Sequence, residues 1–284
     1  ALASGAPLYP QVAGRPTGLL SGFDTTFSFI DGVPAYQALA GRPVPEKIAY
    51  LRTAEGRAAV VDWEPDPDTA AQLVHAAERT YLLGDPPDYE PGPEATLAAV
   101  AARSGRSVVE VALDAMLADD GTGLLYLPIL NYSDGNSDST REMILHPAAV
   151  LGLADGGAHV GTICDASMPT WMLTHWVRDR TRGERLPLEL IVQRQTSDTA
   201  RLYGLGDRGV LAPGYVADVN LIDLDSTNGT FLNGARIDLA IVREGDRIQI
   251  GPDVTLRYLY REKAELARAD PKARAAAVGL SKRE

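Results

Sequence analysis

The chain has 284 residues, of which 45% are hydrophobic and 23% charged, with a formal net charge of -11. A single cysteine excludes an internal disulfide and predicts a cytoplasmic protein. The acidic balance argues against nucleic acid as a partner. The longest apolar run, residues 124–130, is too short to cross a membrane, so no membrane partner is expected.

The first part of the chain predicts loops followed by helices. The first sixty residues are rich in glycine, proline and aromatic residues, and we expect short strands and loops there. Asp66-Pro67-Asp68 predicts a helix start, and this helix is expected to run to Gly84. Further helices are predicted over residues 94–103 and after the capping box formed by Ser107 and Glu110.

The second half of the sequence predicts strands and helices up to about residue 224, followed by strands without helices. A buried strand is expected at residues 148–153, helices at about 169–182 and 187–204, and a strand at 216–224. In residues 226–260, tight turns and a period of two predict short strands.

The residues after the predicted strand 148–153 carry the most suggestive chemistry. Asp155 and His159 lie in a glycine-rich run, and Cys164 follows. A carboxylate just beyond an apolar strand lies where parallel barrels hold catalytic groups, and imidazole and thiolate are ligands that zinc prefers. His146 opens the same strand unit. The alternative is an ordinary turn, with a packed or capping histidine and a buried cysteine.

Many short motifs between about residues 7 and 225 together resemble the C-terminal portion of N-acyl-D-amino-acid deacylases. These enzymes belong to the amidohydrolase superfamily, in amidohydrolase family 3. The motifs are Arg15-Pro16, Tyr89-Glu90-Pro91, Asn131-Tyr132, His146-Pro147, the run 152–159, Cys164-Asp165, Pro169-Thr170, Trp176-Val177-Arg178, Leu186-Pro187-Leu188-Glu189, Asp207-Arg208-Gly209, Pro213-Gly214 and Ala217-Asp218.

The resemblance implies an α/β fold in which residues 1–225 form a partial (β/α)8 barrel of a metal-dependent hydrolase, with a helical insertion at about residues 60–130. It implies zinc as cofactor and Asp155 as general base. The expected reaction is hydrolysis of the non-peptide C–N bond of a small N-acyl-D-amino acid or a related amide. The family's His-x-His pair is not in this sequence, so we expect the chain alone to be incomplete as an enzyme.

A second resemblance begins at about residue 225. The string Ser226-Thr-Asn-Gly-Thr-x-x-Asn-Gly234 and the later Glu244-Gly245-Asp246-Arg247 are similar to the C-terminal half of a forkhead-associated (FHA) domain. Such domains are β-sandwiches that bind phosphothreonine peptides. The resemblance places Thr227, Asn228 and Asn233 in the peptide-contacting loop.

We therefore predict three segments: a hydrolase-like partial barrel at 1–225, an FHA-like β segment at 226–260 and a charged tail at 261–284. Three functions stay open at this point. They are an amidohydrolase, a module that binds phosphothreonine peptides, and an inactive fusion fragment.

Overall fold

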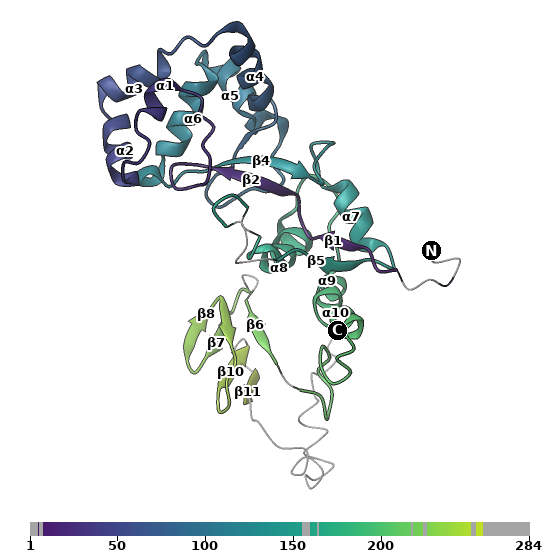
Figure 1. Ribbon diagram of the computed structural model, residues 1–284. Coiled ribbons are helices and arrows are strands. Elements are labelled where there is room, and N and C mark those ends of the chain that lie inside the picture. Colours follow the sequence, from purple (N-terminus) through teal and green to yellow (C-terminus); the bar gives the residue numbers. More distant parts are fainter. Residues whose placement is uncertain are drawn as a thin grey trace. The chain divides into compact units, whose positions relative to one another are not determined.

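The computed structural model describes residues 5, 8–154, 160–163, 165–216, 218–223, 226–250 and 254–257. The chain divides into two compact units, Ala1–Leu188 and Glu189–Glu284 (Figure 1). The division falls inside the predicted hydrolase segment 1–225, so the last part of that segment shares a compact unit with the predicted β segment. The described residues form a mixed α/β structure whose sheets have two to four strands.

The first sixty residues contain two short strands, as expected, at β1 (Gln11–Ala13) and β2 (Thr17–Ser21). Three short helices follow between residues 34 and 61, so the expectation of strands and loops is wrong for this stretch. Pro34 and Pro45 lie in the first turns of two of these helices, where the missing N–H of proline leaves no hydrogen bond unmade. Thr53 caps the third by accepting from the Gly56 N–H. These helices are α1 (Pro34–Gln37), α2 (Val44–Leu51) and α3 (Ala54–Val61).

The predicted helix starts further along the chain are confirmed. Asp66 accepts from the Asp68 and Thr69 N–H groups at the start of α4 (Pro67–Ala77). Ser107 accepts from the Glu110 N–H at 3.1 Å at the start of α6 (Val108–Leu117). Between them lies α5 (Leu97–Ser104). The helix α4 ends before Gly84 because the chain passes into β3 (Tyr81–Leu82), which pairs with a neighbouring strand.

The core of the first unit lies among these helices, with α6 at its centre. This helix contacts α3, α4 and α5. It buries four side chains completely or almost so, and they pack with residues of the other helices in one apolar cluster. The four are Val111, Ala112, Leu113 and Met116.

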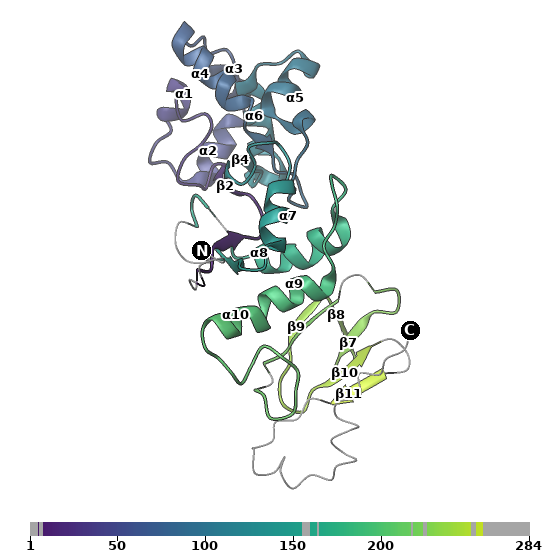
Figure 2. The ribbon, with the colours of Figure 1, turned by 90° about the vertical axis from the view of Figure 1, so that its right-hand side faces the viewer.

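The first unit also contains two small sheets, which lie beside the helices in Figures 1 and 2. The strands β2 (Thr17–Ser21), β4 (Leu125–Leu130) and β3 form an antiparallel sheet in the order β2-β4-β3. The strand β1 (Gln11–Ala13) pairs in parallel with β5 (Val150–Gly152). The helices lie toward one end of the β2–β4 pair, and β1 and β5 lie toward the other.

Three further helical segments flank the parallel pair. The helix α7 (Asp138–Leu145) precedes β5, in agreement with the buried strand predicted at 148–153. After β5 comes α8 (Met168–Trp171), which continues directly as a π-helix over Met172–Asp179. The helix predicted at 169–182 therefore ends early and changes its hydrogen-bond pattern within its length.

The second unit begins with two short helices and continues with strands. The helix predicted at 187–204 is interrupted at Thr196, whose backbone is not helical, and forms α9 (Leu188–Gln195) and α10 (Ser197–Leu202). The strands form a β6–β9 pair and a sheet in the order β11-β10-β7-β8. They are β6 (Asn220–Ile222), β7 (Thr230–Leu232), β8 (Ala235–Ile237), β9 (Leu239–Ile241), β10 (Arg247–Ile250) and β11 (Val254–Arg257).

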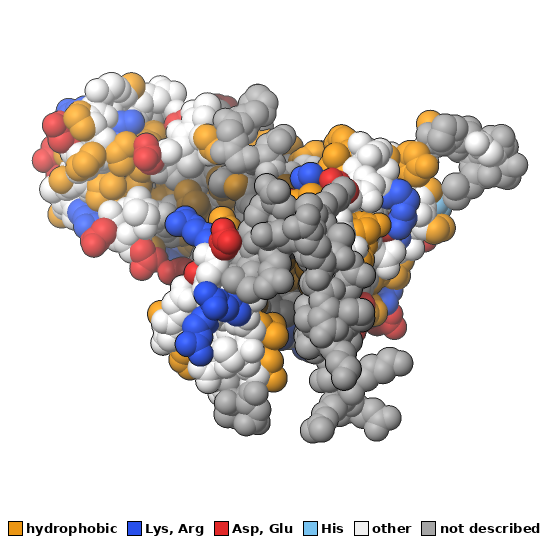
Figure 3. All heavy atoms as spheres, turned by 90° about the horizontal axis from the view of Figure 1, so that it is seen from below, with side chains coloured by type: hydrophobic (Ala, Val, Ile, Leu, Met, Phe, Trp, Pro, Cys, Tyr) orange, Lys and Arg blue, Asp and Glu red, His pale blue; other side chains and the backbone are white. Residues whose placement is uncertain are grey.

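The face of the protein seen in Figure 3 carries side chains of mixed character. On the face that Figure 3 shows, acidic side chains lie singly or beside basic ones among apolar groups. No helix in the described part of the chain is both long and apolar enough to cross a membrane.

Replacing Leu113 by alanine tests the helical core. Leu113 is 0% exposed, so Leu113→Ala is expected to lower the unfolding free energy of the first unit by about 3 kcal/mol through the cavity it leaves. All three tryptophans lie in this unit, so tryptophan fluorescence in a urea titration reports its unfolding. The control Leu130→Ala, at a side chain that is 57% exposed, should cost less than about 1 kcal/mol. Equal losses in the two variants would contradict this placement of the core.

Candidate functional site

The parallel pairing of β1 and β5 brings two strand ends to one edge. The strand β1 leads into Gly14 and Arg15, and β5 leads into Leu153. Leu153 has a φ of 62°, which is uncommon for a residue other than glycine, and such outliers concentrate at functional sites. The carboxyl ends of parallel strands are where α/β proteins hold their ligands. This edge is the candidate functional site.

Arg15 is the charged group at the end of β1. Its side chain is 1% exposed and donates to Asp165 Oδ1 at 3.3 Å and to Ser167 Oγ at 3.2 Å. Its guanidinium carbon lies 3.6 Å from the centre of the Tyr89 ring, in cation–π geometry. Arg15 thereby ties the end of β1 to the segment that returns from β5.

Backbone hydrogen bonds hold the same returning segment on its other side. The Leu20 N–H donates to the Thr162 carbonyl at 2.8 Å, and the Thr26 N–H donates to the Gly161 carbonyl at 2.7 Å. Residues 160–163 are therefore fixed against β2 and the loop that follows it.

A second cluster is built around the carboxylate of Glu90, which is 1% exposed. His175 Nε2 lies 2.7 Å from Glu90 Oε2. Arg180 donates through Nε and Nη2 to the two carboxylate oxygens, each at 3.0 Å, and the Ser137 N–H donates at 2.9 Å. Burial alone would raise the pKa of Glu90, but hydrogen bonds from His175, Arg180 and Ser137 outweigh it and lower this pKa from 4.5 to about 2. Glu90 is therefore a buried, fully engaged carboxylate anion.

Two arginines extend this cluster to neighbouring segments. Arg180 also donates to Asp138 Oδ1 at 2.6 Å, at the start of α7. Arg182 donates to the carbonyls of Glu90 and Pro91 and to the hydroxyl of Tyr132. These bonds join three segments that are far apart in the sequence: residues 90–91, residues 132–138 and residues 180–182.

The π-helix connects the Glu90 cluster to the end of β1. The His175 ring stacks on Trp171, with centroids 4.1 Å apart and an angle of 13° between the planes. Trp176 Nε1 donates to the Gly14 carbonyl at 2.7 Å. A Cβ atom on Gly14 would lie 2.2 Å from Met172 Sδ, so a larger residue at this position would have to displace the Met172 side chain. Short π-helical segments are frequent at functional sites, and this one fixes the orientation of His175 against Glu90.

The residues predicted as the hydrolase site are only partly described. Asp155, His159 and Cys164 lie outside the described residues. His146 is exposed in the turn between α7 and β5, where its Nδ1 accepts from the Ala148 N–H at 3.2 Å. This hydrogen bond stabilises the turn that leads into β5.

The described residues do not fit a catalytic zinc ion. Within the ranges that the structure covers, no group of three or more His, Cys, Asp or Glu side chains could hold a metal. A catalytic zinc needs three protein ligands. We therefore assign no described residue to zinc and derive no step through it.

The predicted phosphopeptide residues lie in two different turns of the second unit. Thr227 and Asn228 are exposed in the turn before β7. Asn233 lies in the turn between β7 and β8 with a φ of 52°. Its side chain donates to Asp246 Oδ1 at 2.8 Å and accepts from the Arg247 N–H at 2.9 Å. Asn233 therefore stabilises the junction of these strands.

Sequence reasoning missed the residues that dominate the first unit. It gave no functional role to Glu90, His175 or Arg180. The signal was nevertheless present, because Tyr89-Glu90-Pro91 and Trp176-Val177-Arg178 are among the motifs that carry the hydrolase resemblance. In the structure, His175 and Arg180, which flank the second motif, both contact Glu90 of the first motif.

Comparison with known protein families identifies a match over most of the chain. The profile described as the amidohydrolase family matches residues 32–247. The match covers most of the first unit and continues beyond residue 225, where the sequence predicted a change of family. No curated protein and no solved structure matches the chain.

The low pKa of Glu90 predicts an acid-sensitive contribution to stability. A carboxyl with a pKa of about 2 in the folded chain and 4.5 ordinarily stabilises the fold above pH 4.5 and loses this effect as the pH falls toward 2. The contribution amounts to about 3 kcal/mol. In urea titrations followed by tryptophan fluorescence, Glu90→Gln should lose about this much at pH 7, and its deficit should shrink below pH 4.5.

The exposed Glu64 provides a matched control, because Glu64→Gln is the same chemical change at the surface of the same unit. This variant should remain close to the wild type at every pH. A Glu90→Gln deficit that does not change with pH would show that the carboxylate charge has no stabilising role.

Proposed function

Since the chain belongs to the amidohydrolase family, we propose that it serves a hydrolase that cleaves the C–N bond of N-acyl-D-amino acids or similar small amides. The coarse part of this function, a metal-dependent hydrolase lineage, comes from the family itself. The substrate class comes from the motifs that resemble the deacylases. Zinc is the cofactor that this resemblance implies.

The parallel edge formed by β1 and β5 is the observation that carries the proposal. Asp155 follows the last residue of β5 by three positions in the sequence, and described residues on either side of this stretch form defined contacts. Leu153, two positions before Asp155, has a left-handed backbone conformation. Asp165, ten positions after Asp155, forms an ion pair with Arg15. A carboxylate at the end of a parallel strand is well suited to proton transfer in a hydrolase.

Asp155 would act as general base in the proposed reaction. It takes a proton from the water that attacks the amide carbonyl carbon, and it returns a proton to the departing nitrogen as the C–N bond breaks. The products are a carboxylic acid and a free D-amino acid. Arg15, Asp165 and Tyr89 would position the segment that bears Asp155 and would not touch the reacting atoms.

We further propose that residues 1–284 do not catalyse this reaction alone. The sequence contains four histidines and one cysteine and no His-x-His pair. The described residues provide no set of three metal ligands. On this proposal the His-x-His ligands come from residues outside this sequence, on the same protein or on a second chain.

The exposed turn that holds Thr227 and Asn228 favours a second candidate, a phosphothreonine-peptide-binding module of the FHA type. Asn233 argues against it, because its side chain is already engaged by Asp246 and Arg247. A titration with a phosphothreonine peptide and its unphosphorylated form decides the matter. Phosphate-dependent binding that Asn228→Ala abolishes would support this candidate, and no such binding would exclude it.

Zinc content tests whether these residues suffice for a metal site. Elemental analysis of the purified chain, refolded with excess zinc and dialysed, should give well below one zinc per chain. Asp155→Ala should give the same value as the wild type. About one zinc per chain, lowered in Asp155→Ala, would contradict the proposed incompleteness.

Complementation tests the proposed activity itself. Hydrolysis of N-acetyl-D-amino acids should appear only when a chain with the His-x-His strand of the same family is added. In that assembly Asp155→Ala should lower turnover at least about 100-fold, as loss of a general base does. The control Asp134→Ala, at an exposed turn, should retain it. Equal turnover in both variants would exclude Asp155 as the base.

A further inference from the structure

The four-stranded sheet of the second unit has two faces of opposite character. The register aligns Phe231 with Arg236 and with Gln249, Gln249 with Thr255, and Arg247 with Arg257. Side chains alternate between the two faces of a strand, so these aligned residues share one face. That face carries Phe231, Arg236, Arg247, Gln249, Thr255 and Arg257. The other face carries Thr230, Leu232, Ala235, Ile237, Ile248, Ile250, Val254 and Leu256.

Arg247 and Arg257 stand directly opposite each other on β10 and β11. Like charges in this position destabilise a sheet, so a further group that neutralises them would stabilise it. Within the described part of the second unit, neither guanidinium forms an ion pair with a carboxylate. The neighbouring Asp246 is already engaged, because it accepts from Asn233 Nδ2 and from the Arg243 N–H. The pair therefore carries a local positive charge in a chain whose net charge is -11.

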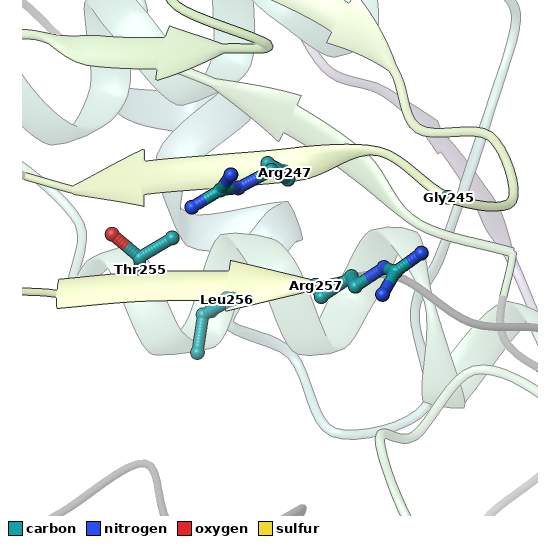
Figure 4. A pocket seen from close by; sticks show the side chains of 5 residues that line it. All are labelled: Gly245, Arg247, Thr255, Leu256 and Arg257. Atoms are coloured by element: carbon teal, nitrogen blue, oxygen red, sulfur yellow. The ribbon is translucent and has the colours of Figure 1, made fainter.

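The two arginines line a pocket of about 450 Å³ together with Gly245, Thr255 and Leu256. Figure 4 shows the Arg247 side chain extending toward Thr255 and the Arg257 side chain extending toward Gly245. The hydroxyl of Thr255 thus lies on the same side of the hairpin as both guanidinium groups. Among the described residues that line the pocket, none is acidic.

We propose that the Arg247–Arg257 pair of the β10–β11 hairpin is a binding site for a phosphate dianion. A guanidinium presents two parallel donors that match two oxygens of a phosphate, and two such groups would balance a dianion. The Thr255 hydroxyl can donate to a further oxygen. The site uses neither Thr227 nor Asn228, and it is independent of amide hydrolysis.

Arg236 lies on the same face but has a different role. A Cβ atom on Gly229 would lie 3.1 Å from Arg236 Nε and 3.3 Å from the Phe231 ring, so both side chains cover Gly229. Gly229 also has a positive φ of 74°. Arg236 therefore packs against the turn, and Arg247 and Arg257 form the anion site.

Titration of the intact chain with inorganic phosphate tests the proposal. In two-dimensional amide NMR at constant ionic strength, phosphate replacing chloride should shift the signals of Gly245, Thr255 and Arg257 in a saturable manner. Arg247→Gln and Arg257→Gln should each weaken binding about tenfold, the size expected for one charge-assisted hydrogen bond. A free phosphomonoester distinguishes the sources: equal affinity assigns the site to the inorganic anion, and tighter binding assigns it to a phosphorylated molecule.

Arg243→Gln is the matched control, because it removes the same charge from the exposed loop before β10 and leaves the pocket unchanged. It should bind phosphate as the wild type does. Shifts that do not saturate in the wild type, or that fall equally in all three variants, would overturn the proposal. The wild-type titration decides the question even if a variant fails to fold.

Discussion

The burial of the Glu90 carboxylate is the constraint on which the arrangement of the first unit depends. Removing a carboxylate from water costs several kcal/mol, and the fold tolerates it only if every oxygen finds a donor. His175, Arg180 and the Ser137 N–H supply those donors. Because they outweigh desolvation, the pKa of Glu90 falls to about 2 and the group stays charged. The segments that carry the donors must therefore meet at this point.

The consequences of this buried charge extend to the candidate site. His175 stacks on Trp171, and the Trp171 ring also packs edge-on against Tyr89. Tyr89 in turn lies beneath Arg15, which binds Asp165. The ion cluster and the carboxyl edge of the β1–β5 pair are thus two ends of one packed assembly. Glu90 therefore helps to hold the segments that form this edge.

Local signals in the sequence predict part of this structure. Asp66 and Ser107 cap helices as expected because each cap depends on residues two or three positions away. Helices α1–α3 were missed because Pro34 and Pro45 indicate loops as readily as first helical turns. The Glu90–His175 contact joins residues 85 positions apart, and no local pattern indicates such a pairing. Arg247 and Arg257 face each other because of the register between β10 and β11. The alternation of side chains along each strand does not determine this register.

Hydrogen exchange of the wild type and Glu90→Gln at pH 7 tests most directly whether Glu90 holds these segments together. The account predicts faster exchange in both residues 132–145 and residues 172–186, and unchanged protection in α5 and α6, which do not contact the carboxylate in the described hydrogen bonds. Unchanged protection in both segments would contradict the central role of Glu90. It would mean that apolar packing alone fixes the edge formed by β1 and β5.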